Sequence, residues 1–198
     1  SEHAIVTDCA STKASVVRAG EQFLGSAFER FVPGHPIAGS ELSGPTAARA
    51  RLFADKRWLF SPVNDAQSQH VDALMELVRR FGARPAVLNA AEHDALFAEY
   101  SHAPHALVFA ICQAVADGPN AQRLSELAGA GFKDTTRIGA SSPPLWADIL
   151  LDNRDGVIQA MDRYLQAMQQ MREHLAGEDR AALVGQIERA SNWRAGLK

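Results

Sequence analysis

The sequence predicts an α/β segment built on a parallel sheet, followed by an all-helical domain. As far as about Asn89, short β-branched or aromatic runs alternate with helical patterns, which is the order of parallel strands joined by helical crossovers. From Ala90 onward no β-rich run occurs, and the apolar residues fall at helical spacing for nearly the whole remainder. We therefore predict two domains, residues 1–89 and 90–198.

Four apolar runs that end in polar or turn-forming residues are the strand candidates of the first domain. They are residues 3–8, 30–35, 57–63 and 83–89. A helical pattern over 14–25 follows the first run, and an amphipathic segment around 46–54 precedes the third. A second helix is expected over 66–82, because Asn64 offers an N-cap and Gly82 a C-terminal stop.

The second domain is expected to begin with a long helix over 91–116. This helix contains Pro104, which cannot donate a hydrogen bond to the Tyr100 carbonyl, so we expect a kink or freed backbone groups there. Glycines and prolines interrupt the helical pattern over 129–146, and two long helical runs follow. These runs cover roughly residues 145–176 and 178–190.

The bulk composition is that of an ordinary globular protein. Of the 198 residues, 46% are hydrophobic and 22% are charged, which is enough for one good core or two small ones. A net charge of -3, with basic residues interleaved among acidic ones, argues against a nucleic-acid partner. The two cysteines give no disulfide framework, and no apolar run approaches the roughly 20 residues that span a bilayer. We expect a soluble cytoplasmic protein with no membrane partner.

The stretch GHPIAGSELSG, residues 34–44, presents the first candidate for chemistry. His35 lies between a glycine and a proline, so we expect its ring to be displayed from a loop at a strand end, where open parallel sheets bind ligands. An imidazole there suits a general base, while the alternative is a histidine that merely caps a turn. Glu41 follows in the same loop, either as part of the site or as a solvated carboxylate.

A second group of candidates surrounds the proline of the long helix. Ser101, His102 and His105 lie in the stretch SHAPH. The two histidines, three residues apart, form a weak candidate for a metal pair, because no third ligand is placed by a recognised motif. The alternative is that Ser101 and His105 line a polar pocket opened where the helix bends.

Arg137 and Asp134 share a segment bounded by glycines. The planar fork of an arginine suits a carboxylate ligand, and a structural ion pair between these two side chains is the alternative. Trp146 follows as either a pocket wall or a core residue. No stretch matches G-x-G-x-x-G or a P-loop, since GAGF at Gly129 lacks both the third glycine and a preceding strand, so the sequence as given has no phosphate-binding turn.

Four stretches, in order along the chain, resemble the successive signatures of the prephenate and arogenate dehydrogenases, the oxidoreductases of tyrosine biosynthesis. They are VTDCASTK, GHPIAGSELSG, SHAPH and GFKDTTRIGASSPPLW. The resemblance implies an α/β remnant, the C-terminal part of a Rossmann-type parallel sheet, followed by a helical domain that forms a homodimer. It also implies that the opening half of the nucleotide-binding domain is missing, so we expect a fragment that is inactive by itself.

The resemblance further implies an NAD- or NADP-dependent oxidative decarboxylation of prephenate to 4-hydroxyphenylpyruvate, with arogenate as the alternative substrate. His35 matches the histidine that accepts the proton of the substrate hydroxyl, and Ser11 matches the serine near that hydroxyl and the nicotinamide. Thr12 is expected beside the cofactor, and Arg137 matches the arginine that grips a substrate carboxylate. Five further residues match positions that line or gate the substrate pocket: Ser101, His105, Glu41, Asp134 and Trp146.

Two rival interpretations stay open on the sequence. β-Hydroxyacid dehydrogenases share the plan of a nucleotide domain followed by helices, but they are expected to use a catalytic lysine on a helix, whereas the candidate base here is a loop histidine. The other rival is a non-catalytic dimerisation or regulatory module. Between the two substrates, His105 favours prephenate.

Overall fold

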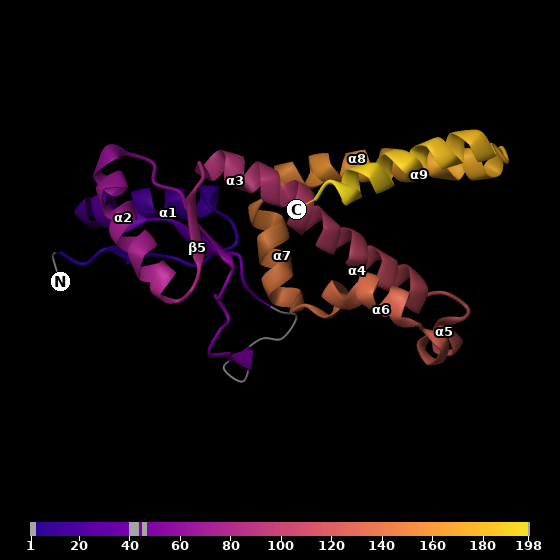
Figure 1. The fold of residues 1–198 in the computed structure, drawn as a ribbon, viewed down its shortest axis with the longest axis horizontal. Helices are drawn as coiled ribbons and strands as arrows, with labels where there is room; N and C mark the ends of the chain where they lie inside the picture. Colours follow the sequence, from indigo (N-terminus) through magenta and orange to yellow (C-terminus); the bar gives the residue numbers. More distant parts are fainter. Residues whose placement is uncertain (1–2, 40–43, 45–46, 198) are drawn as a thin grey trace. The chain divides into compact units, whose positions relative to one another are not determined.

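The computed structural model describes residues 3–39, 44 and 47–197, in which a small strand-bearing region is followed by helices (Figure 1). The chain divides into two compact units, residues 1–157 and 158–198. The strands, the helices that cover them and the first helices of the C-terminal region all belong to the first unit.

Two short sheets form the strand-bearing region. Strand β1 (Val6–Thr7) pairs in parallel with β2 (Phe31–Val32). In the second sheet, β4 (Arg57–Phe60) lies between β3 (Gly34–Pro36) and β5 (Arg84–Val87). The predicted parallel pairing is confirmed for β1 with β2 and for β4 with β5.

The pairing of β3 with β4 is antiparallel, which corrects the expectation of parallel strands throughout. Among the described residues that connect these strands, 37–39, 44 and 47–56, no α-helix occurs, and residues 50–55 form turns. The described part of the connection therefore offers no helical crossover, which a parallel pair would need. His35 is also not in a loop. It is the middle residue of β3 and pairs with Leu59 of β4, because the backbone takes an extended conformation immediately after Pro33.

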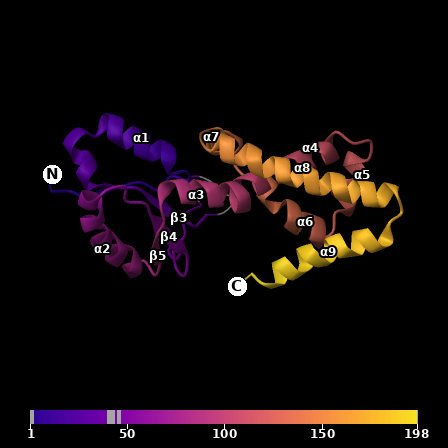
Figure 2. The same ribbon diagram turned by 90° about the horizontal axis from the view of Figure 1, so that it is seen from above.

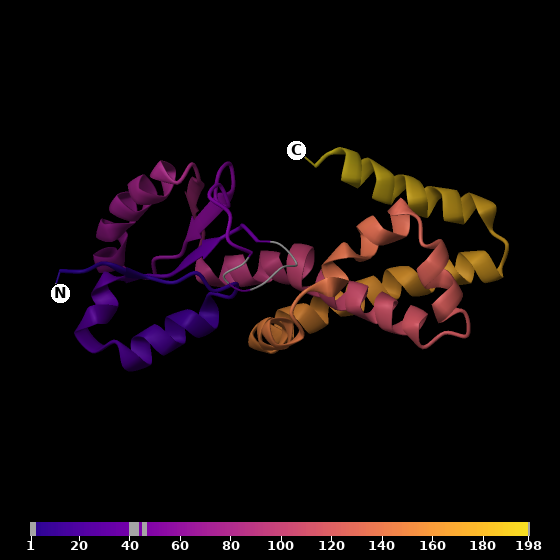
Figure 3. The same ribbon diagram turned by 90° about the horizontal axis from the view of Figure 1, so that it is seen from below.

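Helix α2 (Asp65–Arg80) supplies the main apolar face that covers the strands. As predicted, Asn64 caps it by accepting a hydrogen bond from the backbone N–H of Gln67, 2.9 Å away. The core between the helix and the strands contains Val78 of α2 and Phe60 of β4, 2% and 0% exposed. Helix α1 (Ala14–Phe23) lies on the other side of the strands (Figures 2 and 3).

The long helix expected around Pro104 is interrupted. Helix α3 (Ala90–Phe97) passes through a π-helical turn, η3 (Ala98–His102), into α4 (Ala103–Ala116). Proline lacks an N–H group, and a wider turn before it relieves the loss of the regular hydrogen bond. The predicted disturbance is therefore confirmed, and it occurs where two of the candidate site residues lie.

The glycine- and proline-rich stretch after α4 is more helical than expected. Beyond α5 (Ala121–Leu127), helix α6 (Ala130–Thr136) leads into a 3₁₀ turn, η4 (Arg137–Ala140), and then α7 (Pro143–Asp152). The predicted interruptions of the helical pattern occur at Gly129 and over residues 137–142, with the short helix α6 between them. Helix α7 begins within the stretch because a proline at the first helical position leaves no hydrogen bond unmade.

Helices α8 (Arg154–Ala176) and α9 (Arg180–Ala195) complete the chain. The predicted single run from residue 145 breaks at Asn153, whose side chain donates to the Asp94 carbonyl at 2.7 Å. Helix α9 turns back along α8, where Gln186 Nε2 donates to the Ala167 carbonyl at 2.9 Å. Among the described residues, no helix has the length and apolar character needed to cross a membrane.

Candidate active site

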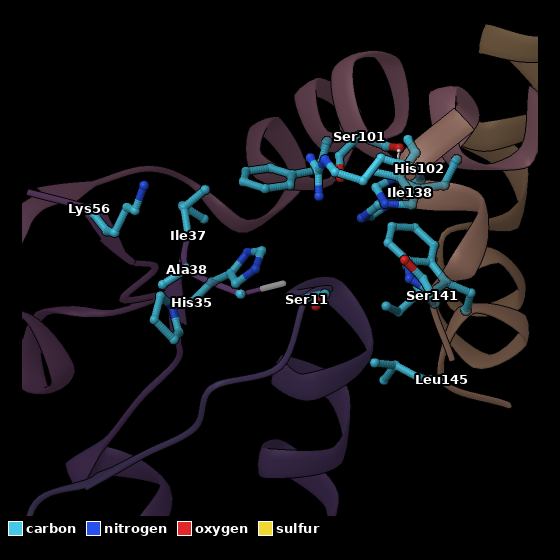
Figure 4. A pocket seen from close by; sticks show the side chains of 17 residues that line it. Ser11, His35, Ile37, Ala38, Lys56, Ser101, His102, Ile138, Ser141 and Leu145 are labelled. Carbon is cyan, nitrogen blue, oxygen red and sulfur yellow. Dashed lines mark hydrogen bonds between the residues drawn. The ribbon is translucent and has the colours of Figure 1, made fainter. Parts of the chain in front are cut away.

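A cavity of about 370 Å³ lies in the first unit, between the strand β3 and the helices that follow residue 90. Seven of the residues singled out from the sequence line it: Ser11, His35, Ser101, His102, His105, Arg137 and Trp146. Figure 4 shows His35 and Ile37 entering this cavity from the strand and Ser101 and Ser141 facing them from the helical side. The structure therefore brings the candidate base and the candidate carboxylate-binding arginine to one cavity.

Three other predicted site residues are not among those that line the cavity. Thr12 is buried, and its hydroxyl donates to Asp152 Oδ2 at 2.7 Å. Asp134 is exposed on α6. Glu41 lies outside the described residues.

His35 is the first member of a chain of buried hydrogen bonds. Its Nδ1 lies 2.8 Å from His93 Nε2, and His93 Nδ1 lies 2.8 Å from Asp94 Oδ1. Burial lowers the pKa of His35 to about 3, and the neighbouring His93, Lys13 and His102 add to this effect. The imidazole of His35 is therefore neutral at physiological pH, which is the form that a general base requires.

Asp94 ends this chain and also holds the start of α1. Its Oδ1 accepts the backbone N–H of Lys13 and its Oδ2 that of Ala14, both at 2.8 Å. Burial by itself would raise the pKa of Asp94, but the hydrogen bonds from His93 and from these two N–H groups lower it overall. Asp94 is thus a carboxylate at neutral pH.

Lys13 ties the loop after β1 to the strand that carries the candidate base. Its buried ammonium donates to Asp8 Oδ2 at 2.6 Å and to the Gly34 carbonyl. Asp8 in turn accepts the backbone N–H of Gly34 at 2.8 Å. Burial lowers the pKa of Lys13, although the adjacent Asp8 opposes the shift. These contacts fix the backbone on both sides of Ser11 relative to His35.

An aromatic wall forms the opposite part of the cavity. Trp146 stacks on His105 with ring centroids 3.5 Å apart and planes 18° apart. His105 Nδ1 donates to the Ser101 carbonyl at 2.8 Å, which leaves Nε2 as an acceptor. Burial lowers the pKa of His105, so this ring too is neutral.

His102 contributes a polar ring nitrogen that has no hydrogen-bond partner among the described residues. Asn153 Nδ2 donates to its Nδ1 at 3.1 Å, so the ring proton is on Nε2. That Nε2 is buried and has no hydrogen-bond partner among the described residues, and the ring lines the cavity. Burial also lowers the pKa of His102 to about 4. A ligand with an acceptor atom would satisfy this donor.

The weak metal-pair hypothesis for His102 and His105 gains no support from this geometry. The two rings contact different partners, an asparagine amide and a backbone carbonyl. Within the described part of the chain, no group of three or more His, Cys, Asp or Glu residues could hold a metal ion.

Models of two protein families match consecutive parts of the chain. The prephenate dehydrogenase nucleotide-binding domain matches residues 1–87, and the prephenate dehydrogenase dimerization domain matches residues 89–189. The chain belongs to the prephenate dehydrogenase family. The resemblance drawn from the four sequence motifs is thereby confirmed.

Relatives in this family are longer than the chain. A prephenate dehydrogenase of Bacillus subtilis is 34% identical over 98% of this chain and 52% of its own length. A cyclohexadienyl dehydrogenase of Zymomonas mobilis is 29% identical over 98% of this chain and 66% of its own length. The chain therefore spans about half to two thirds of the length of these relatives.

Solved structures of the family share the fold. The chain superposes on Aquifex aeolicus prephenate dehydrogenase in complex with hydroxyphenyl propionate and NAD+ with a TM-score of 0.88, at 31% identity, covering all of this chain and 68% of that one. Synechocystis arogenate dehydrogenase gives a TM-score of 0.79 at 27% identity, over 98% of this chain and 70% of that one. The predicted fold class, part of a Rossmann-type sheet followed by a helical domain, is confirmed.

Several residues of the site escaped the sequence analysis. His93 and Asp94 sit in the first turns of α3, where a charged pair is ordinarily read as a solvated helix start. His102 was considered only as a metal ligand. Lys13 is the last residue of the motif VTDCASTK, and its spacing of five from Asp8 was the one available signal for the buried ion pair.

We predict that Gly34→Ala destabilises this prephenate dehydrogenase family member. A Cβ at this position would lie 2.8 Å from the backbone carbonyl oxygen of Asp8 and 2.8 Å from the side-chain Oγ1 of Thr7, both at the end of β1. The expected loss in the free energy of unfolding is about 1–3 kcal/mol, measured by chemical denaturation. Gly39→Ala is the control, because a Cβ there meets nothing within 4 Å. Equal effects of the two substitutions would contradict the argument.

Proposed function

We propose that this chain carries the substrate-binding and proton-accepting part of a prephenate dehydrogenase, with arogenate as the alternative substrate. The observation that carries the proposal is the single cavity lined by both His35 and Arg137. Prephenate is a cyclohexadienol with a ring carboxylate. Loss of a hydride from the carbinol carbon and of a proton from its hydroxyl allows carbon dioxide to leave as the ring becomes aromatic. The protein needs to orient the substrate and to take up the proton.

In this proposal His35 accepts the hydroxyl proton, and Arg137 binds a substrate carboxylate through its planar fork. Ser11 lies near the hydroxyl, in the loop that follows β1. At the far end of the substrate, Ser101, His105 and Trp146 line the pocket. Support for this division comes from the geometry: the base is attached to the strands and the aromatic wall to the helices.

NAD or NADP is the proposed cofactor, and it supplies the hydride acceptor when bound. Ser11 and Thr12 follow β1, and the carboxyl ends of parallel strands are where dinucleotides bind in sheets of this class. A relative of known structure was solved in complex with NAD+, which supports the same cofactor type here. Asp134 and Glu41 stay predictions, as do the domain division at residues 89 and 90 and the cytoplasmic location.

We further propose that residues 90–198 form a homodimer. Helices α8 and α9 expose several large apolar side chains, among them Leu165, Met168 and Ile187, which are 61%, 55% and 50% exposed. Such surface is costly in water and is typical of an interface. The match to a dimerization domain supports this assignment.

The proposed activity is tested with the full-length gene product that contains this chain. Reduction of NAD and of NADP is followed by absorbance with prephenate, arogenate and small β-hydroxy acids as substrates. Turnover of prephenate or arogenate supports the proposal, and turnover of the hydroxy acids alone overturns it. A stable dimer in sedimentation that turns over none of these substrates favours the non-catalytic module.

Replacement of His35 by asparagine should lower kcat by roughly 10²-fold or more, the usual scale for loss of a general base, with a smaller change in KM. Asparagine keeps a polar side chain of similar size but cannot take up a proton. Steady-state kinetics on the full-length gene product measure the effect. His70→Asn on α2 is the matched control, since His70 is not among the residues lining the cavity. A decrease in kcat of less than threefold removes His35 from this role.

Replacement of Arg137 by glutamine should raise KM for a carboxylate substrate by roughly 10-fold or more, because a charge-assisted hydrogen bond contributes about 1.5–3 kcal/mol. The kcat should change less than KM. The control is Arg80→Gln, which removes an exposed cation that pairs with Glu76 on α2. An unchanged KM in the Arg137 variant contradicts the proposed binding of the substrate carboxylate by Arg137.

A further inference from the structure

We propose that His93 and Asp94 are positioning residues for His35, and that the proton accepted by His35 is passed on to His93, where Asp94 balances its charge. The identity of the hydroxyl that supplies the proton rests on the function proposed above. The arrangement of protons within the chain of three residues is a property of the protein alone. It follows from the hydrogen bonds, taken in order from the carboxylate.

The order begins at Asp94. Both of its carboxylate oxygens accept hydrogen bonds from backbone N–H groups, those of Lys13 and Ala14. A carboxylate has no proton to donate, so the ring nitrogen 2.8 Å from Oδ1, His93 Nδ1, must carry the hydrogen. The tautomer of His93 is thereby fixed, with Nε2 as its acceptor.

The same logic fixes His35. Its Nδ1 lies 2.8 Å from His93 Nε2, which is an acceptor, so His35 Nδ1 carries the hydrogen and donates it. The remaining ring nitrogen, His35 Nε2, therefore has a free lone pair, in a ring that lines the cavity. This is the tautomer that a general base requires, and without His93 nothing in this chain of contacts would select it.

His35 is a poor final position for the proton. The residue is 8% exposed, and the Lys13 ammonium repels an imidazolium there. His93 is 0% exposed and stacks on Phe97 with ring centroids 4.2 Å apart, but the Asp94 carboxylate lies directly against its Nδ1 and offsets the cost of burying a positive charge. Positive charge is therefore better stabilised on His93 than on His35, and both ring contacts are short enough for transfer.

The transfer balances with the hydride acceptor of the proposed function. The hydroxyl O–H bond breaks, its proton joins His35 Nε2, and the electron pair left on oxygen forms the carbonyl bond as the carbinol carbon loses a hydride, which a bound nicotinamide would accept. The His35 Nδ1–H bond breaks in turn, and that proton joins His93 Nε2, which leaves a neutral His35 of the opposite tautomer and a His93 imidazolium paired with the Asp94 carboxylate. When carbon dioxide leaves, the electron pair of its carbon–carbon bond makes the ring aromatic and returns the carbonyl pair to oxygen, and the proton passes back through His35 to give the phenol hydroxyl.

The proton arrangement is tested by ¹⁵N NMR of the full-length gene product labelled at histidine, without substrate. At neutral pH, we expect the Nδ1–H form of both His35 and His93, assigned by loss of the corresponding signals in His35→Asn and His93→Phe. An Nε2–H form of His35 at neutral pH overturns the proposal.

The kinetic role is tested by the pH dependence of kcat/KM in Asp94→Asn and in Asp152→Asn. The His35–His93 pair must be unprotonated to act as a base, so activity falls at acidic pH, which gives the pH profile its acid limb. Loss of the Asp94 charge destabilises the protonated form of the His35–His93 pair, so the acid limb of the pH profile should move to lower pH. Because the pair then accepts a proton less readily, kcat should fall roughly 10²-fold. Asp152 also holds the start of α1, through Thr12 and Ser15, and its variant should leave the acid limb in place.

The outcomes separate this inference from the proposed function. If the NMR result is as expected but no cyclohexadienol is turned over, the proposed function fails and the arrangement of protons stands. If turnover occurs and both aspartate variants keep the wild-type acid limb, the transfer to His93 fails. Should Asp94→Asn not fold, His93→Phe, whose ring keeps the stacking on Phe97, must show the roughly 10²-fold loss in kcat instead; wild-type kcat in that variant overturns the transfer.

Discussion

The carboxylate of Asp94 is the interaction on which the rest of the site depends. It accepts the first N–H groups of α1, and it accepts the ring proton of His93, so one side chain joins the loop after β1 to the imidazole chain of the candidate base. An unpaired carboxylate in this position would be costly, because it is largely buried. The backbone that presents Ser11 and the tautomer of His35 are consequently determined by the same two oxygen atoms.

A second buried charge stabilises the same region from the other side. The ammonium of Lys13 is 0% exposed and pairs with Asp8, which also binds the backbone of Gly34. Removal of one partner from such a pair leaves an uncompensated charge, so the pair enforces one geometry even where it adds little net stability. Together, Asp94 and Lys13 give the base end of the cavity a rigid frame, in which His35 stays neutral.

The sequence predicted the features that depend on residues close together in the chain. The cap at Asn64, the interruption before Pro104 and the switch from strands to helices near residue 89 follow from local chemistry, and the structure contains each of them. The antiparallel return into β4 and the contact of His35 with His93 depend on residues brought together by folding, 58 positions apart in the second case. Helical and strand periodicity carry no information about such contacts.

The helical end of the cavity differs from the end that holds His35, because its polar groups are neutral histidines whose tautomers are set by hydrogen bonds. His102 and His105 are both neutral, so the charged side chains that line the cavity are Lys56 and Arg137, whereas the two histidines offer one donor and one acceptor. The buried Nε2–H of His102 is a donor that a carbonyl oxygen of a ligand would satisfy, whereas an ammonium group has no acceptor atom to offer. A buried donor left unpaired costs about 1–3 kcal/mol. Asn153 therefore determines, through the tautomer of His102, which kind of polar group this wall of the cavity can bind.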